Sequence, residues 1–179
     1  MANSAGVPDA PIFLIGFMAS GKSTVGRLVA AQLGWAFRDL DEVIETAARR
    51  SVPEIFAAEG EAGFRQREAE AVRQATTLRR TVIATGGGAA CREENLALML
   101  AAGPVVTLAV TPDEVVRRAA GRPARPLLAN AADPRAAAAA LLAAREPFYA
   151  RAHARVDTQD RPPTQVAADV LRVIEALSR

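Results

Sequence analysis

The sequence has very few of the residues that form disulfides, zinc sites and histidine-dependent active sites. Its 179 residues include one cysteine and one histidine. Because Cys91 is alone, neither an intramolecular disulfide nor a cysteine-based zinc site can form. We interpret Cys91 as a small packing residue rather than a nucleophile. His153 is likewise expected to be a surface or packing residue rather than a catalyst.

Long apolar runs are also missing. No stretch approaches the roughly 18 apolar residues that a membrane-spanning helix needs. Residues 1–10 have neither a basic start nor a long apolar run, which argues against a secretory signal peptide. The net charge is only +2, and the basic residues are dispersed among acidic ones, so nucleic-acid binding is not indicated. These absences favour the cytoplasm and argue against nucleic-acid and membrane partners. Separately, we expect a monomer.

Lysine is almost absent, and its one position is informative. Of the 22 basic residues, 21 are arginine and only Lys22 is lysine. Lys22 lies in Gly16–Thr24, which fits the pattern G-x-x-x-x-G-K-[ST] of a phosphate-binding loop. Such a loop uses lysine as a compact point charge, for which a planar guanidinium is a poor substitute. The lack of a second lysine also excludes the Asn-Lys-x-Asp motif that reads guanine in GTPases, so a small-molecule kinase is favoured over a GTPase.

The surroundings of this motif support the same interpretation. The apolar run Pro11–Ile15 predicts a buried strand before it, and apolar residues at helical spacing follow it as far as Gly34. Backbone N–H groups of the loop and the positive end of the helix would hold nucleotide phosphates, and the serine hydroxyl would bind Mg²⁺. The predicted nucleotide-binding residues of the loop are Ala19, Ser20, Gly21, Lys22, Ser23 and Thr24.

Two carboxylates follow a short predicted strand at Ala36–Arg38. On an extended segment Asp39 and Asp41 would face the same side, near the phosphate-binding loop, because ligands of open α/β sheets bind at the carboxyl ends of the strands. One carboxylate could help to hold Mg²⁺, and the other could accept a proton or hydrogen bonds from a substrate hydroxyl. The alternative is that Asp41 merely caps a helix over Glu42–Arg50.

Three later segments carry further signals. The buried strand predicted at Thr81–Thr85 runs into Gly86–Gly88, which indicates the close approach of a ligand or another backbone, or else a flexible turn. Glycine, proline and arginine alternate over Gly121–Pro126, which is typical of a mobile cationic lid, although a plain surface loop is the alternative. A helix that opens at Pro134 is predicted to end or kink at Arg145–Tyr149 because of an internal proline. Strands thus alternate with helices along the chain, which predicts an α/β sandwich around a mostly parallel sheet.

In combination these motifs resemble those of the shikimate kinase family, from about Pro11 to Leu177. The motifs that carry the resemblance are Gly16–Thr24, Phe37-x-Asp39-x-Asp41, Gly60-Glu61-x-x-Phe64-Arg65-x-x-Glu68, Gly86–Gly88, Arg125–Leu128, Arg145-x-x-x-Tyr149 and Val156–Thr158. The resemblance implies phosphorylation of the 3-hydroxyl of shikimate by ATP, with Mg²⁺, in aromatic amino-acid biosynthesis. It also implies one three-layer α/β/α domain over residues 1–179, with a five-stranded parallel sheet of order 2-3-1-4-5. A substrate-binding region would occupy about residues 38–70 and a lid about residues 119–132.

The resemblance further implies roles for single residues on the substrate side. Asp41 would hold the shikimate hydroxyls and act as the base for the 3-hydroxyl. Arg65 and Arg145 would clamp the carboxylate of shikimate, and Gly87 and Gly88 would contribute backbone contacts.

On the nucleotide side, Asp39 would help to position Mg²⁺, with Ser23 as the direct ligand. Arg125 would reach ATP from the lid, and Arg118 and Arg161 would lie near the adenine. Lys22, Asp41 and Arg125 are the expected catalytic residues.

Two features differ from the usual pattern of this family. Ala19 stands where a glycine is common, and Arg161–Pro163 replaces a commoner Asn-Pro ending. Two alternative functions are a kinase for another small hydroxy acid such as gluconate, and a nucleotide-binding regulatory module without catalysis. Ala19 is the one feature that favours the second alternative, because alanine tolerates only part of the backbone range of glycine.

Overall fold

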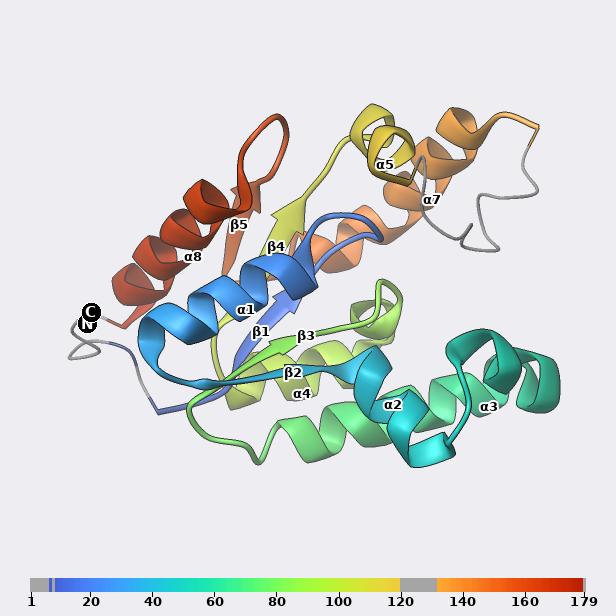
Figure 1. The fold of residues 1–179 in the computed structure, drawn as a ribbon, viewed down its shortest axis with the longest axis horizontal. Helices are drawn as coiled ribbons and strands as arrows, with labels where there is room; N and C mark the ends of the chain where they lie inside the picture. Colours follow the sequence, from blue (N-terminus) through green and yellow to red (C-terminus); the bar gives the residue numbers. More distant parts are fainter. Residues whose placement is uncertain (1–6, 8, 120–131, 179) are drawn as a thin grey trace.

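A five-stranded parallel sheet forms the centre of the molecule, with helices on both faces (Figure 1). The computed structural model describes residues 7, 9–119 and 132–178. The strand order is β2-β3-β1-β4-β5 and every neighbouring pair is parallel, which confirms the predicted order and fold class. The strands are β1 (Ile12–Ile15), β2 (Ala36–Asp39), β3 (Thr81–Ala84), β4 (Val105–Ala109) and β5 (Ala154–Asp157).

The helices follow the strands in alternation. They are α1 (Lys22–Leu33), α2 (Leu40–Ala48), α3 (Val52–Ala75), α4 (Glu93–Ala102), α5 (Pro112–Ala119), α7 (Pro134–Tyr149) and α8 (Pro163–Leu177), with a short 3₁₀ turn η1 (Ala89–Cys91) after β3. Within the described part of the chain, no helix is both long enough and apolar enough to cross a membrane.

The central strand β1 supplies side chains to two separate cores. Because successive residues of a strand face opposite sides of the sheet, Ile12 and Leu14 pack on one face, under α1 and α8. Phe13 and Ile15 pack on the other face, among residues of α2, α3, α4, α5 and α7. All four side chains are fully buried, and each contributes about 1.5–3 kcal/mol to stability by leaving water. This burial fixes the end of β1, from which the phosphate-binding loop begins.

The helix α3 is bent at Gly60, whose φ of 71° and ψ of −177° lie outside the helical range. A residue with a side chain would be strained at this positive φ. Arg67 and Glu59 form a two-pronged ion pair across the bend, with N···O distances of 2.8 and 2.9 Å. The helix α3 packs with α2, and Phe64 and Arg65 lie on the limb that follows the bend.

The helix α7 runs from Pro134 to Tyr149 and therefore ends within the predicted Arg145–Tyr149 segment, with Pro147 inside its last turn. Tertiary hydrogen bonds hold this last turn, since the Thr107 hydroxyl donates to the Tyr149 carbonyl at 2.7 Å. His153, just beyond it, accepts a hydrogen bond from the Val105 N–H through Nδ1 at 3.1 Å, a structural contact at the start of β4.

Candidate active site

The phosphate-binding loop runs from Gly16 at the end of β1 to Gly21, which caps α1. Lys22 is the first residue of α1, and its side chain is largely buried. Its ammonium donates to the carbonyls of Gly16 and Phe17 at 2.9 and 2.8 Å. The lone lysine of the chain therefore lies within the curve of the loop, beside the N-terminus of a helix, where backbone N–H groups favour bound anions.

Ser23 and Asp39 come together as the sequence predicts. The Ser23 hydroxyl donates to Asp39 Oδ2 at 2.5 Å, and Asp39 Oδ1 accepts from the Asp41 N–H at 3.1 Å. Asp39 is therefore the N-cap of α2, and the alternative that Asp41 caps this helix is wrong. The reason lies in the backbone: Asp39 is extended, with φ −102° and ψ 121°, so its side chain reaches the first turn of α2. Asp41 stands inside that first turn.

Asp41 and Glu68 meet over the backbone of Gly86. A Cβ atom added to Gly86 would lie 2.9 Å from both Asp41 Oδ1 and Glu68 Oε1. Glu68 is only 1% exposed, and its Oε2 accepts a hydrogen bond from Arg65 Nη1 at 2.8 Å. Its Oε1 has no hydrogen-bond partner among the described residues. Burial raises the pKa of Glu68, Arg65 opposes that shift, and the nearby Asp41 carboxylate adds to it.

The two predicted arginines approach the same glycines. A Cβ atom on Gly88 would lie 2.7 Å from Arg65 Nη1, and Arg145 Nη1 donates to the Gly87 carbonyl at 3.2 Å. The Tyr149 hydroxyl donates to the same carbonyl at 2.6 Å. Side chains from α2, α3 and α7 therefore approach Gly86–Gly88 closely, and Gly87 and Gly88 form a turn after β3. The close approach of a ligand to this segment stays a prediction.

A second group of predicted residues surrounds a cavity of about 410 Å³ beside the phosphate-binding loop. Its lining includes Ser20, Gly21, Arg118, Thr158 and Arg161. It therefore joins the loop to α5 and to the segment between β5 and α8, as expected for a site that takes the rest of a nucleotide.

The remaining predicted nucleotide-binding residues are Thr24, Ala19 and Arg125. Thr24 is exposed in the first turn of α1, and Ala19 adopts a φ of 60° within the loop. Arg125 lies outside the described residues, as does nearly all of the predicted lid at about 119–132.

Comparison with known proteins identifies the family. The family model described as shikimate kinase matches residues 18–175. The chain belongs to the shikimate kinase family. It is 46% identical over 165 residues to a shikimate kinase of Moorella thermoacetica, covering 92% of this chain and 94% of the relative. It is also 46% identical over 167 residues to one of Symbiobacterium thermophilum, covering 92% and 95%.

Solved structures give the same family. The shikimate kinase of Acinetobacter baumannii, in complex with shikimate, matches with a TM-score of 0.90 and 34% identity, over 97% of this chain and 96% of that one. A gluconokinase of Sinorhizobium meliloti matches with a TM-score of 0.62 at only 15% identity, which shows a shared fold and nothing more.

Two residues next to the candidate site were not among the predicted site residues. Glu68 lies three residues after Arg65 on a helix, and Tyr149 lies four residues after Arg145. Residues at these spacings share a helix face, so the spacing alone signals that each one accompanies its arginine. What the spacing does not give is the burial of Glu68 or the choice of the Gly87 carbonyl by Tyr149.

Proposed function

We propose that this chain transfers the γ-phosphoryl group of ATP to the 3-hydroxyl of shikimate. Membership of the shikimate kinase family supports the reaction. The observation that supports the placement of the site is the convergence of Asp41, Arg65 and Arg145 on Gly86–Gly88, next to the loop that carries Lys22.

The substrate side suits a small hydroxylated carboxylate. Arginine forks match a carboxylate with two parallel hydrogen bonds, so Arg65 and Arg145 would orient the acid. Asp41 would then accept the proton of the reacting hydroxyl as its oxygen forms a bond to the γ-phosphorus. The bond between that phosphorus and the β–γ bridging oxygen breaks in the same step, and ADP leaves. Because phosphoryl transfer needs mainly positioning and charge neutralisation, this arrangement asks for little covalent chemistry from the protein.

The residues around Ser23 fit a magnesium ion brought by the nucleotide. Ser23 and Asp39 present a hydroxyl and a carboxylate oxygen 2.5 Å apart. Mg²⁺ usually binds through one or two protein oxygens, with phosphates and water completing its octahedron. Among the described residues no group of three or more acidic, histidine or cysteine side chains could hold a metal by itself. Held here, Mg²⁺ would neutralise the charge of the phosphate oxygens.

The nucleotide side completes the proposal. Lys22 would exchange its carbonyl partners for the β- and γ-phosphates, with Ala19, Ser20, Gly21 and Thr24 around them. Arg118 and Arg161 would flank the adenine in the 410 Å³ cavity. Arg125 would approach from a lid at about 119–132. In this proposal a single domain contains the site, with a substrate-binding region at about 38–70.

The test is ADP release from Mg-ATP, measured by a coupled assay with shikimate, with gluconate and with neither. Shikimate alone should stimulate ADP release. Stimulation by gluconate instead would assign the chain to another hydroxy acid. ATP binding without ADP release in the presence of shikimate would indicate a regulatory module. The expected monomeric state is checked separately by light scattering after size-exclusion chromatography, and the cytoplasmic location by fractionation of cells.

A further inference from the structure

The phosphate-binding loop contains a residue in an unfavourable conformation. Ala19 has a φ of 60°, in the left-handed region that residues with a Cβ rarely adopt. Glycine enters this region without steric cost, whereas alanine favours negative φ. The loop geometry at Ala19 therefore needs support from outside the loop.

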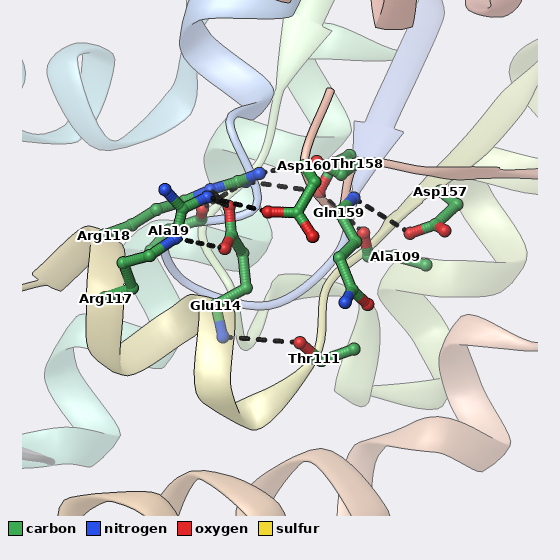
Figure 2. A network of polar contacts seen from close by, with 10 residues as sticks. All are labelled: Ala19, Ala109, Thr111, Glu114, Arg117, Arg118, Asp157, Thr158, Gln159 and Asp160. Carbon is green, nitrogen blue, oxygen red and sulfur yellow. Dashed lines mark hydrogen bonds and ion pairs between the residues drawn. The ribbon is translucent and has the colours of Figure 1, made fainter. Parts of the chain in front are cut away.

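A side chain from outside the loop, that of Arg118, forms a hydrogen bond with the backbone of Ala19. Arg118, on α5, donates from Nη1 to the Ala19 carbonyl at 3.1 Å, although the two residues are 99 positions apart in sequence. The same guanidinium donates to Thr158, from Nη1 to the hydroxyl at 3.2 Å and from Nη2 to the carbonyl at 2.6 Å. Figure 2 shows Arg118 lying between the loop and the segment that follows β5.

The other side of this network is itself fixed. Thr158 donates to the Ala109 carbonyl of β4 through both its N–H at 3.1 Å and its hydroxyl at 2.8 Å. Arg118 Nε is paired with Glu114, which is only 4% exposed and also holds Arg117 (Figure 2). A guanidinium held by a strand-anchored threonine and a buried carboxylate has little freedom to move. The Ala19 carbonyl is thus tied to a rigid partner.

We propose that Arg118 is a positioning residue that keeps Ala19 at positive φ and so keeps the loop in its phosphate-binding shape. This inference rests on the proposed binding of nucleotide phosphates by the loop. This role differs from the proposed contact with adenine. Arg118 lines the 410 Å³ cavity in which the adenine would lie, and it also holds the phosphate-binding loop. Arg118 would support the binding of a phosphate chain that carries no base at all.

The test is a double-mutant cycle of the full chain with inorganic triphosphate and Mg²⁺ as the ligand, followed by calorimetry. The four proteins are the parent, Arg118→Met, Ala19→Gly and the double variant. Arg118→Met should weaken triphosphate binding in the Ala19 background. In the Ala19→Gly background the same change should weaken it about fivefold less, which corresponds to about 1 kcal/mol of coupling.

Arg117→Met is the matched control. Arg117 pairs with the same Glu114 and carries the same charge, but among the hydrogen bonds of the described residues the Ala19 carbonyl accepts from Arg118 and not from Arg117. Its loss should affect both backgrounds equally, since long-range attraction does not depend on residue 19. If Arg118→Met unfolds, as circular dichroism would report, Arg118→Lys runs the same cycle, because a lysine keeps the charge beside Glu114 but lacks the fork.

Three results have distinct meanings. An equal loss of triphosphate affinity in both backgrounds would overturn the positioning role. Loss of ATP binding with unchanged triphosphate binding would also overturn it and would leave Arg118 as a base contact only. A parent chain that binds neither ligand would overturn the proposed function, and this inference with it.

Discussion

Ser23, at the start of α1, and Asp39, at the end of β2, share a hydrogen bond of 2.5 Å between side-chain oxygens. The same carboxylate caps α2 through the Asp41 N–H. One aspartate thus connects the proposed metal position to the helix that carries the proposed base. Changes at Asp39 can therefore act on either neighbour, and the choice of substitution separates the two effects.

Asp39→Asn should impair the response to magnesium and preserve the helix. Asparagine caps a helix about as well as aspartate, so the free energy of unfolding should change by less than about 0.5 kcal/mol. The lost charge should raise the Mg²⁺ concentration for half-maximal activity by about tenfold or more. Activity as a function of Mg²⁺ concentration, beside urea unfolding, measures both. An unchanged Mg²⁺ dependence would remove Asp39 from the metal site.

Asp41→Asn should lower kcat for shikimate phosphorylation by about 10² to 10⁴, the usual contribution of a general base. The affinity for ATP should stay within about twofold, since Asp41 is not part of the phosphate-binding loop. Steady-state ADP release and calorimetric ATP titration check the two expectations. A kcat close to that of the parent would show that another group takes the proton.

Gly88→Ala should weaken shikimate binding through Arg65. The new Cβ would lie 2.7 Å from Arg65 Nη1, the far end of a flexible side chain, so the guanidinium would move and the fold would remain. We expect KM for shikimate to rise about tenfold, the value of one charged hydrogen bond. In an Arg65→Ala background the same change should have almost no further effect. If the increases in KM for shikimate caused by Gly88→Ala and Arg65→Ala were additive in the double variant, Gly88→Ala would not act through Arg65.

The stability difference between the parent and Glu68→Gln should depend on pH. Burial raises the pKa of Glu68 above its unfolded value, so the folded state favours the protonated acid. Below the unfolded pKa both states are protonated and this contribution is fully present. It is lost as pH rises through the raised folded pKa, because the buried carboxyl must then ionise. Glutamine does not ionise, so the parent should lose stability relative to Glu68→Gln towards neutral pH.

Denaturant unfolding of both proteins between about pH 4 and pH 8 measures this difference, and the contributions of the other acids cancel. A parent that gains stability relative to Glu68→Gln as pH rises would mean that the Arg65 pairing outweighs burial.

The sequence was sufficient for the fold because its signals are local. The apolar run of β1, the glycines of the loop and the helical spacing after Lys22 fix one strand–loop–helix unit, and the later strands repeat the alternation. The parallel order followed from the family resemblance, and the structure confirms it. Tertiary contacts explain why α7 continues past Pro147 and ends at Tyr149: the hydrogen bonds of Tyr149 to Thr107 and Gly87 hold a turn that the proline alone would weaken.

The candidate site was predictable in its residue types but not in its connections. Asp39 and Asp41 both suit a helix cap, and only the extended backbone of Asp39 decides between them. The contact of Arg118 with Ala19 spans 99 positions and depends on how α5 packs, which no short-range pattern contains. Likewise, the burial of Glu68 Oε1 depends on how α3 packs against the segment after β3, so the sequence alone does not predict it.

The bend of α3 at Gly60 is held by an ion pair. The two-pronged pair of Arg67 with Glu59 spans the bend, so the angle between the two limbs is set when the chain folds. Arg65 lies on the second limb, between Gly60 and Arg67, so the direction of its side chain depends on the angle that this ion pair holds. The Arg65 guanidinium would therefore already be oriented before a carboxylate substrate binds. None of the free energy of substrate binding would be needed to bend the helix.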